Sequence, residues 1–273
     1  MKSWPFRLGF IVIGAIIAIA YWQLYLPGQE EPEQRFTPAP VVQPSVEPVI
    51  QHPVNTTPEE LKSTESLIDP EEPLPNLKQS DSPMAEILAK LFSDQKLARF
   101  FILEHFIERF VVMVDNLPRP QLPVTHRPLK KTPGKFLAQG TRDQLTIAPN
   151  NYKRYTPLIK TWAALDTAQV VAVYKRLYPL FQKAYQELGY PKAYFNDRLV
   201  AVIDHLLVSP QTTGPIYLTQ PKALYLYADP DLEALSAGRK ILLRCGPENA
   251  AQIKILLHKY RKLIAGSEQV DSS

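Results

Sequence analysis

The chain contains a single cysteine and only ten glycines among its 273 residues. One cysteine excludes an intrachain disulfide, and the apolar neighbours of Cys245 predict a buried structural thiol. Scarce glycine argues against loops that cradle nucleotide phosphates. No Gly-x-Ser-x-Gly elbow, His-Glu-x-x-His, Cys-x-x-Cys or phosphate-binding glycine loop occurs. We therefore predict no catalytic residues and no cofactor from sequence motifs.

Residues 8–29 carry no charged side chain, and 8–26 are apolar almost throughout. Nineteen helical residues reach about 29 Å, close to the roughly 30 Å hydrocarbon core of a bilayer. Lys2 and Arg7 precede this run, and positive charge stays on the cytoplasmic side of a membrane. We expect a single transmembrane helix over 8–26, with residues 1–7 inside the cell and the rest exported.

The same run offers an alternative, because Ala18-Ile19-Ala20 has the small-x-small pattern of a signal-peptide cleavage site. The apolar run continues through Tyr21–Leu26 instead of giving way to polar residues, which favours a retained anchor. Both interpretations export the rest of the chain.

An acidic, proline-rich linker is expected over 27–81. Residues 27–83 contain twelve prolines, one glycine, and eleven acidic against three basic side chains, a net charge of −8. Such a segment buries too little apolar surface to offset its conformational entropy, so we predict a disordered, locally polyproline-like tether. Residues 84–273 have 26 basic and 16 acidic side chains, a net charge of +10. This charge favours an anionic partner or, alternatively, serves only solubility.

Helix caps and apolar faces recur from Ser82 onward and predict a mainly α-helical bundle over 82–266, followed by a disordered tail at 267–273. The second expected helix includes residues 97–114, which are apolar on nearly every side of a helix. Short strands are expected at the pair 136–139 and 144–147, and at 216–218 and 223–227. Helices are expected to start at Ser82-Pro83, Ser93, Thr156-Pro157, Asp166, Pro191, Asp229-Pro230 and Gly246-Pro247.

Two groups of acidic and histidine residues are candidates for chemistry. Glu104 and Glu108 lie one turn apart on the second expected helix, with His105 beside them, as in helical metal sites. The complete di-iron pattern is missing, so we expect no metal and an arginine such as Arg198 to neutralise the two carboxylates. Asp204-His205 is adjacent on a helix, so its side chains should point in different directions.

The best binding candidates are basic and aromatic. Residues 117–135 form a basic, proline-rich strap, and Asn151–Tyr155 interleaves basic with tyrosine side chains, which suits a sugar or an anion. The alternative is that both tyrosines pack inward while the charged side chains are solvated. The candidate site residues are Lys130, Lys131, Tyr152, Lys153, Arg154 and Tyr155.

Several sequence blocks are shared with a known family. They include Val114–Pro118, Asn151-Tyr152-x-Arg154-Tyr155, Tyr178–Phe181, Glu187–Pro191, Asp197–Leu199 with Val202–Asp204, Gly214–Ile216, Ala228–Pro230 and Leu243-Arg244-x-Gly246-Pro247. Over roughly residues 80–265 the chain resembles the bacterial family called domain of unknown function 3014. The resemblance implies a single-pass inner-membrane protein of Gram-negative type, and it brings no activity, ligand or catalytic residue.

These observations lead to two hypotheses about function. The first is an interaction or scaffold module that is tethered to the membrane, faces the periplasm and binds an anionic envelope partner. That partner would be a glycan, a lipid headgroup or an acidic protein segment, and export disfavours nucleic acid. The alternative is an envelope hydrolase whose active-site residues are scattered along the sequence.

Overall fold

The computed structural model of the chain describes residues 49–55, 73–91, 101–123, 125–130 and 134–265. Within these ranges, no helix is both long enough and apolar enough to cross a bilayer. The expected transmembrane run at 8–26, the N-terminal residues before it and the C-terminal tail lie outside the described ranges.

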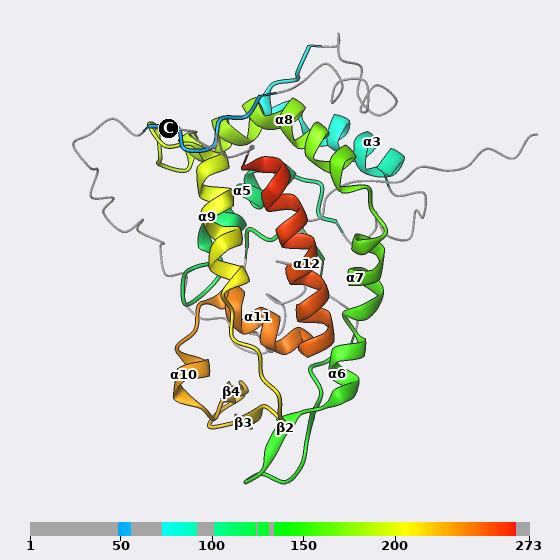
Figure 1. The fold of residues 1–273 in the computed structure, drawn as a ribbon, viewed down its shortest axis with the longest axis vertical. Coiled ribbons are helices and arrows are strands. Elements are labelled where there is room, and N and C mark those ends of the chain that lie inside the picture. The colour runs from blue at the N-terminus through cyan, green and yellow to red at the C-terminus, as the bar shows by residue number, and fades with distance from the viewer. Residues whose placement is uncertain (1–48, 56–72, 92–100, 124, 131–133, 266–273) are drawn as a thin grey trace, which may run out of the picture.

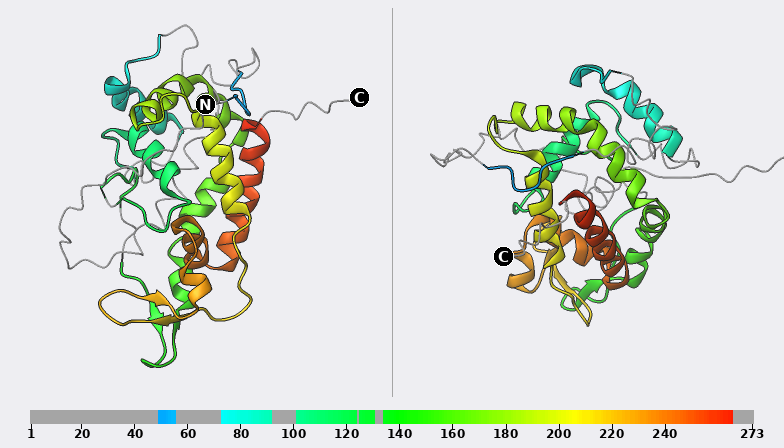
Figure 2. Two further views of the ribbon diagram at one scale, coloured as in Figure 1. Left: turned by 90° about the vertical axis from the view of Figure 1, so that its left-hand side faces the viewer. Right: turned by 45° about the horizontal axis from the view of Figure 1, so that its top comes forward.

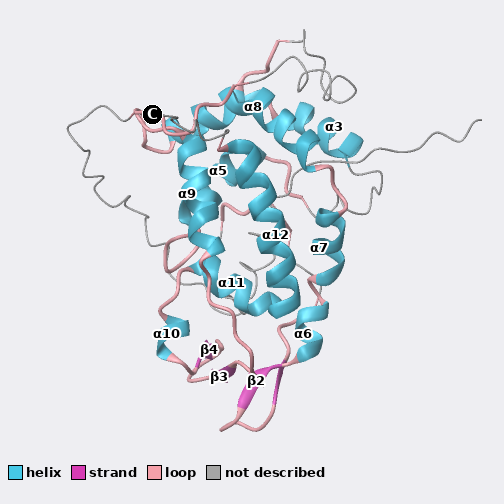
Figure 3. Cartoon of the chain, viewed as in Figure 1, coloured by secondary structure: helices cyan, strands magenta, loops and turns pink. Residues whose placement is uncertain are grey.

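The described chain is mainly helical, with a small sheet at one end of the bundle (Figures 1 and 3), as predicted. The expected starts of the helices near Thr156, Asp166 and Pro247 are confirmed. The helices are α3 (Asp81–Leu91), α5 (Phe106–Asn116), α6 (Pro149–Lys153), α7 (Thr156–Ala163), α8 (Thr167–Glu187), α9 (Phe195–Leu207), α10 (Pro230–Glu233), α11 (Ala237–Cys245) and α12 (Pro247–Ile264), with a 3-10 turn η2 at Leu77–Gln79.

The core lies where α5, α8, α9 and α12 meet. Figure 2 shows these helices from two further sides, with α8 crossing one end of the bundle and the sheet at the other. Aromatic rings fill the centre of the core: Phe110 contacts Phe181 at 5.4 Å between ring centroids, and Phe181 stacks on Phe195 at 5.9 Å. Stacked and edge-on aromatic pairs add stabilisation beyond the area they bury.

The longest helix, α8, begins and ends as its sequence predicts. The Asp166 carboxylate accepts hydrogen bonds from the backbone N–H groups of Ala168 and Gln169 at 2.9 and 3.2 Å, which caps the helix. Pro179 lies inside the helix, and the ribbon bends between the two halves of α8 (Figure 1). This bend places the C-terminal half of α8 over α5 and α9.

The expected helix through residues 97–114 is wrong at 101–105, because α5 begins only at Phe106. Residues 92–100, where the expectation also applies, lie outside the described ranges. His105 adopts a left-handed conformation with φ 51°. The Asp81 carboxylate, at the start of α3, accepts hydrogen bonds from the N–H groups of His105 and Phe106 at 2.9 and 3.3 Å. Ile102 donates its N–H to the Pro128 carbonyl at 2.8 Å, so its backbone pairs with the strap instead of continuing a helix.

The single helix expected from Asp229 to Leu243 is also wrong, because the chain forms two helices there. The Asp229 carboxylate caps the short α10 by accepting from the Asp231 N–H at 2.9 Å. Ser236 then caps α11, its hydroxyl accepting from the Arg239 N–H at 3.3 Å. A second capping residue seven positions later therefore restarts the helix in a new direction.

The sheet has four short antiparallel strands in the order β1-β2-β3-β4. The strands are β1 (Ala138–Gln139), β2 (Leu145–Ile147), β3 (Tyr217–Thr219) and β4 (Leu226–Tyr227). Ala138 lies opposite Ile147, Leu145 opposite Leu218, and Leu218 opposite Tyr227. The predicted strand pairs are confirmed, and they enclose a second apolar cluster below α11.

Two described stretches of the expected linker, 49–55 and 73–80, lie against the helical domain. The Asp197 carboxylate on α9 accepts from the His52 N–H at 2.7 Å. Leu77 is buried within the main core. These stretches differ from the expected disordered linker, and the folded region begins before the boundary that composition predicted.

Candidate functional site

The part of the predicted basic and aromatic site that lies in α6 and the turn after it, residues 151–155, is at the end of the bundle that carries the sheet, where α6 follows β2 (Figure 1). Lys130 on the strap and Lys153 on α6 are exposed, as a surface site requires. Lys131 lies outside the described residues. The site therefore keeps its basic part at the surface.

Arg154 connects α6 with the strap. Its guanidinium donates to the Asn151 side-chain oxygen at 3.1 Å and to the Gly134 carbonyl at 3.0 Å. Burial lowers the pKa of Arg154. Because two of its donors are used within the protein, Arg154 acts first as a structural contact that positions the end of the strap beside α6.

The expected surface role of Tyr155 is wrong, because only 1% of this residue is exposed. Tyr152 is half-buried, and its ring lies against Gly246. Asn249 on α12 donates its amide to the Tyr152 carbonyl at 2.9 Å. Both tyrosines follow the inward-packing alternative, because α6 and α7 turn this side towards the core.

Behind α6 lies a buried arginine that the motif analysis missed. Arg244 on α11 is only 1% exposed, and its guanidinium carbon lies 5.2 Å from the Tyr227 ring centroid. The Asn151 amide donates to the Arg244 carbonyl at 3.4 Å. The sequence did contain a signal for this burial, because Arg244 stands between Leu243 and Cys245 on the apolar side of α11.

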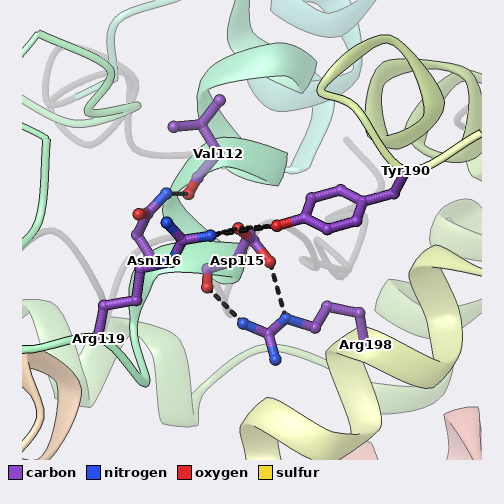
Figure 4. A network of polar contacts seen from close by, with 6 residues as sticks. All are labelled: Val112, Asp115, Asn116, Arg119, Tyr190 and Arg198. Carbon is purple, nitrogen blue, oxygen red and sulfur yellow. Dashed lines mark hydrogen bonds and ion pairs between the residues drawn. The ribbon is translucent and has the colours of Figure 1, made fainter. Parts of the chain in front are cut away.

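A second buried charge, Asp115, links α5 to α9 (Figure 4). Arg119 donates to its carboxylate at 2.8 Å and Arg198 at 2.9 Å, while the Tyr190 hydroxyl donates at 3.2 Å. Arg198 also donates to the Asp115 backbone carbonyl at 2.6 Å. Burial, and then the Asp115 charge, raise the pKa of Tyr190, so its hydroxyl stays protonated and donates.

The expected pairing of Arg198 with the two glutamates is therefore wrong. Glu104 precedes α5, and its carboxylate lies 3.6 Å from a guanidinium nitrogen of Arg109, five residues later in the sequence. His105 lies 3.6 Å from a Glu108 carboxylate oxygen. In the part of the chain that the structure describes, no three His, Cys, Asp or Glu side chains converge in a possible metal site.

The adjacent residues Asp204 and His205 have different partners, as predicted. Asp204 forms an ion pair with Arg261 on α12. The His205 ring nitrogen Nε2 lies 2.7 Å from the Ser236 hydroxyl. Cys245 is confirmed as a buried thiol, and burial raises its pKa well above the ordinary cysteine value.

Comparison with known proteins identifies a family for this chain. No curated protein and no solved structure matches the chain significantly. A family described as protein of unknown function (DUF3014) matches residues 106–261, from the start of α5 to near the end of α12. The matched region is more than half of the chain and contains Asp115, Arg198 and Arg244. The chain therefore belongs to the DUF3014 family.

Proposed function

We propose that the protein is an interaction module of the bacterial envelope, tethered to the inner membrane through residues 8–26, with its folded domain in the periplasm. The domain would bind an anionic partner, which is a glycan, a lipid headgroup or an acidic protein segment. The observation that carries this proposal is charge: residues 84–273 have a net charge of +10. Surface charge of one sign attracts partners of the other sign and speeds their encounter.

The partner would contact what we call the basic edge, defined as Lys130, Lys135 and Lys153. All three are exposed. The hydrogen bond from Arg154 to the Gly134 carbonyl holds the end of the strap against α6, so Lys135 and Lys153 belong to neighbouring segments. Each exposed lysine attracts an anion over about a Debye length, about 8 Å at physiological ionic strength.

In-cell crosslinking tests this proposal. A reagent that cannot cross the inner membrane should capture the wild-type partner from the periplasmic side. A variant in which the three basic-edge lysines are changed to alanine should lose most of this capture. Raising the salt concentration should weaken capture by the wild type, because exposed charges are screened.

The matched control changes three other exposed lysines to alanine, namely Lys183, Lys192 and Lys262, which lie on or next to α8 and α12. It removes the same charge but should keep the capture, and circular dichroism should show the same helical content in both variants. Undiminished capture by the basic-edge variant would contradict the site. Selective loss in the control variant would move the site to the end of the bundle away from the sheet.

The runner-up, an envelope hydrolase, is favoured by one observation: the short contact between His205 and Ser236. Burial lowers the pKa of His205, and the nearby cations Arg239 and Arg198 lower it further. A general base must accept a proton, which these cations oppose. Ser236 also caps α11 through the Arg239 N–H. The pair therefore has the features of a structural cap.

A fluorophosphonate probe, which reacts with activated serines, separates the two functions. We expect no labelling of the purified protein, because His205 is a poor base. Ser236→Ala serves as the reference. Labelling of the wild type that disappears in this variant would establish a hydrolase instead.

A further inference from the structure

Among the described residues, three charged side chains are buried: Asp115, Lys240 and Arg244. Asp115 has two arginine partners in Figure 4, and the Lys240 ammonium lies 2.9 Å from a Glu233 carboxylate oxygen. Arg244 differs from both. Its Nε and Nη1 atoms have no hydrogen-bond partner anywhere in the described ranges.

The Tyr227 hydroxyl lies within reach of the Arg244 side chain, but the two donors Nε and Nη1 remain without an acceptor among the described residues, which is costly for a buried guanidinium. Arginine has five N–H donors, no acceptor, and keeps its positive charge in proteins. A buried charge is tolerated only where it is paired and hydrogen-bonded. The Tyr227 ring beside Arg244 supplies a cation–π contact but no acceptor for Nε and Nη1. The group that would complete the hydrogen bonding of Arg244 is therefore a negatively charged acceptor.

The surroundings of Arg244 are rich in further donors. The Tyr155 hydroxyl is buried, the Asn151 side chain lies within its reach, and no acceptor for its proton is found within the described part of the chain. Burial raises the pKa of Tyr155, so this hydroxyl keeps its proton and can donate. Both Arg244 and Arg154 interact electrostatically with Tyr155, so a second guanidinium is close. The Arg154 guanidinium carbon lies 5.9 Å from the Tyr155 ring centroid.

We propose that Arg244, together with Arg154 and Tyr155, forms a binding site for a small oxyanion, a phosphate or a carboxylate group, between α6 and α11. The Nε and Nη donors of arginine form a fork that matches two oxygens of such a group. The Tyr155 hydroxyl adds a third donor. The site is separate from the exposed basic edge and does not rest on the function proposed above.

The position of the site implies a structural effect. The hydrogen bond from Asn151 to the Arg244 carbonyl already joins α6 to α11. An oxyanion on Arg244 and Tyr155 adds a second connection between the start of α7 and the end of α11, beside the sheet. A ligand that binds only the folded state stabilises it by mass action.

Thermal unfolding of the full-length protein in a nonionic detergent tests the site. Inorganic phosphate or acetate is titrated at pH 7 and at constant ionic strength, with sodium chloride as the balance. The wild-type midpoint should rise by several degrees with a saturable dependence on the anion. A response to phosphate alone identifies a phosphoryl ligand, and a response to acetate alone identifies a carboxylate; either supports the site.

Matched variants separate this effect from the general stabilisation that phosphate gives by exclusion from protein surfaces. Arg244→Met should lose the saturable response, and Arg244→Lys should weaken it because the fork is lost. Tyr155→Phe removes only the hydroxyl. Half-saturation of the response should then require an anion concentration about tenfold higher, which corresponds to the loss of roughly one charge-assisted hydrogen bond. Lys183→Ala, which removes an exposed charge on α8, outside both the basic edge and this site, should respond like the wild type.

Two outcomes would overturn the proposal. One is a wild-type midpoint without a saturable response to either anion. The other is an equal response in the wild type, Arg244→Lys and Tyr155→Phe, which would mean that the anion acts elsewhere. Because these two variants keep the buried volume nearly unchanged, the test remains decisive even if Arg244→Met does not fold.

Discussion

Replacing Asp115 with alanine should lower the free energy of unfolding of the domain by about 3 kcal/mol. The carboxylate is 3% exposed and accepts from Arg119, Arg198 and Tyr190. Without it, two guanidinium groups face each other with no anion between them. Breaking a buried ion pair from one side costs about 3–5 kcal/mol. We expect the lower end of this range, because the two arginines are about one-third exposed and water screens them.

The matched control is Asp204→Ala, which removes an aspartate–arginine pair that is more exposed on both sides. It should cost less than about 1 kcal/mol, as exposed pairs do. Asp115→Asn keeps one acceptor oxygen and should fall between the two. Urea unfolding followed by circular dichroism measures all three. If Asp115→Ala and Asp204→Ala lower the free energy of unfolding equally, the buried Asp115 network stabilises the domain no more than an exposed ion pair does.

The parts of the fold that the sequence predicted correctly are those set by local chemistry. The Asp166 cap of α8 depends on residues within one turn of each other. Proline in the first turn of α7 and of α12 correctly predicted where these two helices begin. For such elements the residues that decide the structure are visible together in a short window.

The parts that failed depend on contacts between distant residues. The start of α5 is fixed by Asp81, which lies 24 residues before His105. The Arg198–Asp115 pair spans 83 residues. No periodicity within the apolar run at 97–114 contains this information, since the run alone favours a continuous helix. The exposed lysines of the candidate site were predicted from the sequence. Arg244 was missed, because its burial also depends on contacts between distant residues.

The contact between residues 49–55 and α9 also changes the geometry of the proposed tether. With an anchor ending at residue 26, only residues 27–48 separate it from the first described contact at the folded domain. A fully extended polyproline II segment of this length reaches about 70 Å, well below the reach of a linker that runs to residue 81. The proposed partner would therefore lie no farther from the membrane than about 70 Å plus the length of the folded domain.

Replacing Gly246 with alanine should lower the free energy of unfolding by about 3 kcal/mol, from two separate causes. Gly246 joins α11 to α12 with φ 87° and ψ 161°, a region essentially limited to glycine, where strain costs about 1–3 kcal/mol. A Cβ atom there would lie 2.4 Å from Cγ of the Tyr152 ring, and overpacking of this kind costs about 1–3 kcal/mol. The Asn249 amide donates to the Tyr152 carbonyl at 2.9 Å, which fixes the backbone of Tyr152, so the clash is relieved only if its side chain rotates.

Two other glycines separate these causes. Gly189 has φ 115°, and a Cβ atom added there would meet nothing within 4 Å, so Gly189→Ala reports strain alone and should cost about 1–2 kcal/mol. Gly214 has an open environment and a φ outside the left-handed region, so Gly214→Ala should be neutral or stabilising by up to about 1 kcal/mol. Urea unfolding of the three variants should give the order Gly246, Gly189, Gly214 from largest to smallest loss. If Gly246→Ala costs no more than Gly189→Ala, the Tyr152 ring yields to the added methyl group, and the packing of α6 against the α11–α12 junction is looser than the contacts indicate.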